Sequence, residues 1–180
     1  MNFDALAGWE EAAEHVPPWT PGAPPRPALR LAWAAGCAPF VRVQGVEVVR
    51  ISEMLAAHTI DALKERGHQP DPVLITLPRY CIEVLVPLAS TTVWFPHRYT
   101  TCTAAVLMRC PAPEVTSGRW VAGRTWTRSP GTGLPLTNAH ALAGAVPEAL
   151  ARWHDSLTAR IEGCAGDRPT PGPHRKDTRP

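Results

Sequence analysis

The sequence predicts an α+β fold, in which one domain packs its helices against a mostly antiparallel sheet. Its 180 residues fit a single domain with terminal tails, and 44% hydrophobic against 19% charged residues suits a globular protein with its own core. Short β-rich runs are separated by turn signals, and several stretches carry the apolar spacing of helices. These observations place helices and strands in the same domain.

The first 27 residues are expected to form an N-terminal helix and a linker. Residues 3–15 place Phe3 and Leu6 on one side and a cluster of glutamates opposite, the pattern of an amphipathic helix. The next segment, V-P-P-W-T-P-G-A-P-P-R-P, holds six prolines in twelve residues. Because proline fixes φ and lacks an amide hydrogen, this segment predicts an extended linker that takes no part in a sheet. Trp19 is expected to anchor it on the body.

The first half of the domain combines two helices with two β-rich runs. A short helix is predicted over 28–36, ended by a glycine. The β-rich runs 38–43 and 46–51 follow, separated by a Gln-Gly turn dipeptide. Ser52 is a good N-cap for a helix over roughly 53–66.

The second half is expected to complete the sheet. The runs 73–76 and 80–87 predict paired strands around a Leu-Pro-Arg turn, and the second has the apolar character of a central strand covered on both faces. The runs 91–95 and 103–110 are expected to continue the sheet, and a loop over 111–118 to close it.

The C-terminal part is predicted to be an irregular arm followed by helices. The arm covers 123–137, where Thr137 caps a helix and Pro147 starts another. An apolar stripe marks the last helix: Leu150, Trp153, Leu157 and Ile161. Residues 163–180 have no aliphatic side chain able to build a core and are expected to be a disordered tail, which leaves 28–162 as the domain.

Charge argues against a protein that grips duplex DNA. The chain carries a net charge of +2, and residues 163–180 contain four basic and two acidic residues, so the body up to Glu162 is neutral. Duplex-binding domains usually show a clear basic excess. The first residues lack the basic start of a secretory signal and no apolar run is long enough to span a bilayer, so we expect a cytoplasmic protein that does not enter the membrane.

No motif in the sequence predicts a metal or a cofactor. The five cysteines lack C-x-x-C spacing, and the seven histidines form no H-x-x-x-H pair. A G-x-S-x-G elbow, which a serine hydrolase needs, is also missing. Glu47 and Glu83 are the carboxylates within predicted strands, and each is expected to face solvent, whereas two-metal catalysis needs carboxylates that converge.

Several segments occur in an order that resembles a known family. V-E-V-V-R-I opens a helix that ends A-L-K-E-R-G, and D-P-V-L-I-T-L-P-R-Y leads into V-L-V-P. A-A-V-L-M-R-C-P-A-P and then G-R-T-W-T-R-S-P-G-T-G-L-P-L-T-N-A-H-A-L complete the series. Over about Leu29 to Val146 the chain resembles short actinobacterial relatives of the bifunctional DNA primase/polymerase (Prim-Pol) domain. The resemblance implies a Prim-Pol-like α+β fold and a link to DNA replication or mobile elements.

The chain departs from that family where the family carries its chemistry. The resemblance places an Asp-x-Asp pair at the positions held here by Arg50 and Ser52. A Ser-x-His motif would fall near L-P-R-Y-C-I-E-V, which has no histidine, and a third acidic residue would fall in the uncharged Y-T-T-C-T. A Cys- and His-containing segment of longer relatives is replaced by the proline-rich linker. The leading hypothesis is therefore a non-catalytic binding or regulatory module, with no cofactor and no catalytic residue.

Two alternatives stay open. One is an active nucleotidyl-transfer enzyme with relocated residues, for which the candidates are Glu47, Glu83, His97 and Arg98, provided that at least two of these side chains converge in one pocket. The other is a protein-interaction adaptor that presents tryptophans near the linker to a protein partner. These tryptophans are Trp9, Trp19 and Trp33.

Any surviving site for single-stranded nucleic acid or a nucleotide is expected on the sheet face that Arg50 shares with the turn at Arg79. Arg98 and Arg109 lie near the ends of adjacent predicted strands and are the next candidates. Arginine suits this role because its planar guanidinium makes two bonds to a phosphate at once.

Overall fold

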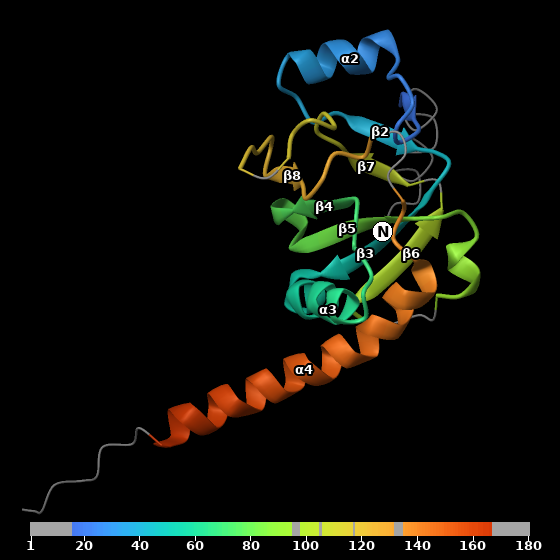
Figure 1. The fold of residues 1–180 in the computed structure, drawn as a ribbon. Coiled ribbons are helices and arrows are strands. Elements are labelled where there is room, and N and C mark those ends of the chain that lie inside the picture. The colour runs from blue at the N-terminus through green and yellow to red at the C-terminus, as the bar shows by residue number, and fades with distance from the viewer. Residues whose placement is uncertain (1–15, 95–97, 105, 117, 132–134, 167–180) are drawn as a thin grey trace, which may run out of the picture.

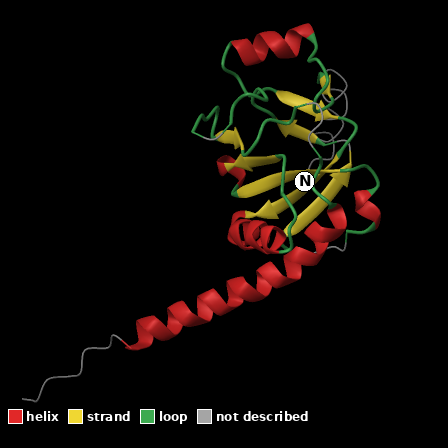
Figure 2. Ribbon diagram, in the orientation of Figure 1, coloured by secondary structure: helices red, strands yellow, loops and turns green. Residues whose placement is uncertain are grey.

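The computed structural model describes residues 16–94, 98–104, 106–116, 118–131 and 135–166. It confirms the α+β class: two sheets, paired mostly antiparallel, pack with helices in one body (Figures 1 and 2). The helix predicted over 3–15 lies outside the described residues. None of the helices in the described part of the chain combines the length and apolar character that a membrane crossing requires.

The larger sheet has five antiparallel strands in the order β6-β3-β5-β4-β8. The strands are β3 (Glu47–Ser52), β4 (Val73–Thr76), β5 (Cys81–Val86), β6 (Thr100–Ala104) and β8 (Arg124–Trp126). The predicted hairpin of β4 and β5 is confirmed, and its turn is the 3-10 helix η1 (Leu77–Arg79). The prediction that β5 is central and covered on both faces is also confirmed, because five of its six residues are buried.

The smaller sheet shows that the proline-rich linker does join a sheet, contrary to the prediction. Its order is β1 (Pro18–Trp19), β2 (Phe40–Val43) and β7 (Leu107–Arg109), with β1 parallel to β2. The linker contributes carbonyl groups, which proline retains: Pro17 O and Trp19 O accept the amides of Arg42 and Gln44 at 3.1 and 2.9 Å. An edge strand tolerates prolines at positions where the ladder needs no amide from them.

Three other predictions about the sheets are wrong in part. The run 91–95 holds no strand among its described residues and begins within a 3-10 helix, η2 (Ser90–Thr92). The run 103–110 is divided, because β6 belongs to the larger sheet and β7 to the smaller one. The arm over 123–137 contains β8, whose Trp126 is fully buried and whose backbone pairs with β4.

The helices are α2 (Pro27–Ala34), α3 (Glu53–Glu65) and α4 (Ala139–Gly166). The first two agree closely with the predicted ranges. In α4 the prediction of two helices is wrong, since one helix runs through Pro147 and includes residues 163–166 of the predicted tail. Asn138, not Thr137, caps it: the Asn138 side chain accepts the Ala141 amide at 2.9 Å, whereas the Thr137 hydroxyl donates to Asp71 O.

The larger sheet is buried on both faces. On one face it packs against α3 and α4 through Val49, Ile51 and neighbouring apolar side chains. On the other face Val48, Leu85 and Trp126 pack against the smaller sheet, with α2 beyond it (Figure 1). Helices, larger sheet and smaller sheet thus form successive layers, and α4 extends well past the body (Figure 1).

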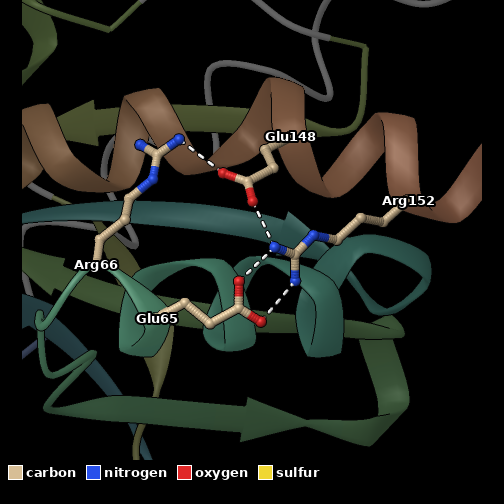
Figure 3. A network of polar contacts seen from close by, with 4 residues as sticks. All are labelled: Glu65, Arg66, Glu148 and Arg152. Atoms are coloured by element: carbon tan, nitrogen blue, oxygen red, sulfur yellow. Dashed lines mark hydrogen bonds and ion pairs between the residues drawn. The ribbon is translucent and has the colours of Figure 1, made fainter.

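An ion-pair network ties α3 to α4 on the surface (Figure 3). The Arg152 guanidinium bonds both Glu65 and Glu148, and Arg66 donates to the other oxygen of Glu148 at 2.7 Å. Hydrogen bonding from Arg152 lowers the pKa of Glu65, and bonds from Arg66 and Arg152 lower the pKa of Glu148. The network adds surface contacts between α4 and α3 to the apolar packing between these helices.

Candidate anion-binding site

Glu83 is buried, so the expectation that it faces solvent is wrong. It is 1% exposed, because the face of β5 from which it extends is covered by the smaller sheet. Its carboxylate is fully engaged: Oε1 accepts Arg50 Nε at 2.7 Å, and Oε2 accepts the Thr76 hydroxyl at 3.1 Å. A buried carboxylate needs such partners to remain charged.

Two arginines from different elements meet at this carboxylate. Arg50 lies directly opposite Glu83 across the β3–β5 pair, and Arg79 reaches the same Oε1 from η1, with Nη1 at 3.8 Å. Arg50 Nη2 is also 3.5 Å from the carbonyl oxygen of Leu107. The side chains of Arg50 and Arg79 remain 28% and 43% exposed. Glu83 therefore holds two guanidinium groups in place while both still face solvent.

These arginines line an open pocket at one end of the larger sheet, where β3 ends and β5 and β6 begin. The pocket has a volume of about 380 Å³ and also contains Arg98, whose guanidinium lies 5.5 Å from the centre of the Tyr99 ring. Its lining is Arg50, Ser52, Arg79, Tyr80, Cys81 and residues 98–101. Three guanidinium charges against the one carboxylate of Glu83 leave an excess of two positive charges.

An exposed aromatic ring and a neutral thiol complete the lining. Tyr80 is 72% exposed and has a left-handed backbone with φ of 49°, a conformation that costs energy in a residue other than glycine. Its carbonyl accepts the Glu53 amide at 2.8 Å and so ties η1 to the start of α3. Burial and then the charge of Glu83 raise the pKa of Cys81, so its thiol stays protonated at neutral pH and is no thiolate nucleophile.

Arg109 and Arg124 lie close by but do not line the pocket. Burial, the charge of Arg109 and that of Arg79 lower the pKa of Arg124, while Glu83 opposes the shift. The Arg109 guanidinium lies 5.0 Å from the centre of the Phe40 ring. The structure thus brings Arg50, Arg79 and Arg98 of the expected set together and leaves Arg109 on the neighbouring β7.

Glu47 is also buried, and it lies on the opposite face of the larger sheet from Glu83. It is 4% exposed, and its carboxylate accepts the amides of Ala89 and Thr91 at 3.0 and 2.6 Å, which fixes the segment after β5. Burial and Glu47 raise the pKa of Cys102 to about 11. The two glutamates face different layers and do not converge, whereas Glu83 is bonded to Arg50 in the pocket that Arg98 also lines. His97 lies outside the described residues, and the relocated-enzyme alternative stays a prediction.

The tryptophans named for an adaptor surface belong mainly to the core. Trp19 is 3% exposed, and its ring packs edge-on against Trp33 with 5.6 Å between centroids. Trp33 donates to the carbonyl of Cys110 at 3.0 Å and is partly buried. Trp9 lies outside the described residues. Burial therefore removes Trp19 from any presented patch.

Sequence reasoning found the arginines but missed the residues that organise them. The expectation that Glu83 faces solvent conflicts with the prediction that its strand is covered on both faces, and the structure resolves the conflict in favour of burial. The four-residue separation of Arg79 and Glu83 across a tight turn is a signal that could have indicated their contact. No sequence signal marked Tyr80 as an exposed residue with a left-handed backbone.

Across the described ranges, no group of three or more His, Cys, Asp or Glu side chains is placed to hold a metal ion. No protein-family model matches the chain, and no curated protein or solved structure matches it significantly. The resemblance to the Prim-Pol domain therefore stays a prediction.

Proposed function

We propose that the chain is a non-catalytic, Prim-Pol-like module that binds the phosphate of single-stranded nucleic acid or of a nucleotide. One observation carries the proposal: Arg50, Arg79 and Arg98 come from three separate segments and line one open pocket around a buried carboxylate. Guanidinium groups bind phosphate through paired, charge-assisted hydrogen bonds.

The charge of the pocket supports binding rather than metal-dependent catalysis. The resemblance implies metal-binding carboxylates at the positions of Arg50 and Ser52, and both residues line this pocket. Two excess positive charges attract an anion and repel a divalent cation at the same place. The same scaffold position then serves ligand binding without the chemistry of nucleotidyl transfer.

The form of the site favours a single strand over a duplex. Tyr80 offers an exposed ring beside the arginines, on which an unpaired base can stack. The arginines of the site gather in one pocket and do not spread along a surface that could follow the two backbones of a duplex.

Binding of a labelled single-stranded oligonucleotide of about 12 nucleotides, followed by fluorescence anisotropy, tests the proposal. Affinity is expected to fall as salt rises from about 50 to 200 mM, since phosphate binding displaces counterions. Arg79→Ala and Arg98→Ala are each expected to weaken binding roughly 10-fold, through the loss of charge-assisted bonds. Both variants keep the bond between Arg50 and Glu83 and should therefore fold. Circular dichroism checks that they do.

The matched control is Arg30→Ala, an exposed arginine on α2, which should bind like the parent protein. Unchanged binding by both pocket variants contradicts the proposal. Template-dependent nucleotide incorporation in a primer-extension assay with Mg²⁺ or Mn²⁺, lost in the Arg79→Ala variant, contradicts its non-catalytic part.

A further inference from the structure

We propose that the pocket selects a terminal phosphate monoester, at the end of a strand or on a mononucleotide, over the diester phosphates within a strand. The inference rests on the proposed function, because it specifies which phosphate the Arg50–Arg79–Arg98 pocket takes. It follows from the charge of the pocket, the separate segments that supply its donors and the lack of further basic residues in its described lining.

The charge excess matches a monoester better than a diester. Glu83 accepts bonds from Arg50 and Thr76, and the lining itself contains no carboxylate among the described residues, so Glu83 is the one negative charge counted with the three lining arginines. An excess of two positive charges remains. A phosphate monoester carries about −1.5 to −2 at neutral pH, whereas each diester carries about −1. A diester would leave about one of the two excess positive charges of the pocket uncompensated.

The donors come from three separate segments. Arg50 extends from β3, Arg79 from the turn η1 and Arg98 from the segment before β6, around an open concavity of about 380 Å³. A terminal phosphate presents three free oxygens to such an arrangement. A phosphate within a strand has two free oxygens and nucleotides on both sides, so it offers these donors fewer acceptors.

The surroundings do not extend the pocket into a track for a backbone. Within the part of the chain that the structure describes, the lining of the pocket holds no basic residue besides Arg50, Arg79 and Arg98. Arg124 is buried, and Arg109 lies over the Phe40 ring outside the pocket. Affinity is therefore concentrated in one phosphate and should not grow with the number of phosphates in the ligand.

The test compares one oligonucleotide sequence in three forms, with a 5′-phosphate, with a 3′-phosphate and with hydroxyl groups at both ends, each labelled internally. At least one phosphorylated form is expected to bind about 10-fold more tightly than the hydroxyl form, as one additional charge-assisted contact provides. Inorganic phosphate and a nucleoside monophosphate should compete with it. Lengthening the strand should change the affinity little.

Variants separate this inference from the proposed function. Arg79→Ala and Arg98→Ala should abolish the preference, whereas Arg30→Ala should keep it. Equal binding of all three forms that still weakens in the pocket variants overturns the terminal-phosphate inference and leaves the proposed function standing. A preference that survives both pocket variants also overturns the inference, because it places the terminal phosphate elsewhere. If neither variant affects any form, both proposals fail.

Discussion

Glu83 shows how one buried charge organises a surface site. Its carboxylate is out of contact with water, yet it is bonded by Arg50 and Thr76 and lies near Arg79. Removing one partner of a buried ion pair usually costs more than the pair contributes, because the remaining charge loses its compensation. Glu83 is therefore expected to matter for the stability of the fold as well as for the position of the arginines.

Glu83→Gln should lower the free energy of unfolding by about 2–3 kcal/mol, less than a fully enclosed pair would cost because Arg50 is partly exposed. Urea denaturation at pH 7 measures the change. The control is Glu162→Gln, an exposed glutamate on α4, which should change stability by less than about 0.5 kcal/mol. Equal effects of the two substitutions would show that Glu83 is not a structural anchor.

Among the elements, α4 depends on its surface network and carries an internal proline. Arg152 links it to α3 through Glu65, while Glu148 is shared with Arg66 (Figure 3). The first turns of the helix are held by buried apolar side chains such as Leu142. Leu157 and Ile161 of the predicted stripe are exposed, so they do not add to the core.

Arg152→Met is expected to lower the Tm at pH 7 by roughly 1–3 °C, a small effect because the network is exposed to solvent. The pKa values of Glu65 and Glu148 are lowered from the ordinary value of 4.5 in the folded protein. Their contribution is thus present above that value and is lost as the pH falls through the lowered pKa values. The Tm difference between parent and variant should shrink on acidification, and Arg160→Met should show no such pattern. A Tm difference independent of pH contradicts this origin.

Pro147→Ala should stabilise the protein by about 1–3 kcal/mol, because proline inside a helix removes one backbone hydrogen bond and crowds the preceding turn. Chemical denaturation measures the gain. The expectation depends on one continuous helix from Ala139 to Gly166. If two helices met at Pro147, as the sequence pattern suggested, proline at a first-turn position would be favourable and the substitution would destabilise.

At the scale of the whole molecule, local signals predicted local structure well. The hairpin of β4 and β5 and the helix α3 follow from turn residues and apolar spacing that lie within the segments themselves. The strands β1 and β8 were missed because each is two or three residues long and is defined by a distant partner. The burial of Glu47 and Glu83 was missed for the same reason, since it depends on layers contributed by other parts of the chain.

For the candidate site, the arginines were predictable and their arrangement was not. Arg50, Arg79 and Arg98 stand at the ends of segments with a recognisable strand pattern. That they share one pocket, while Arg109 does not, follows from the separation of β6 and β7 into different sheets. No signal within the 103–110 run marks that division.

The division between the sheets has a consequence for how ligand binding and unfolding are coupled. The chain passes from β2 to β3 and again from β6 to β7, and at this crossing the Val43 amide bonds the Val106 carbonyl at 3.0 Å. One apolar cluster continues across both sheets, from Val41 and Met108 to Leu85. Segments joined in this way are expected to open together. An anion bound at the pocket, as proposed, should then stabilise the whole folded population by mass action and delay the melting of all layers instead of ordering a single loop.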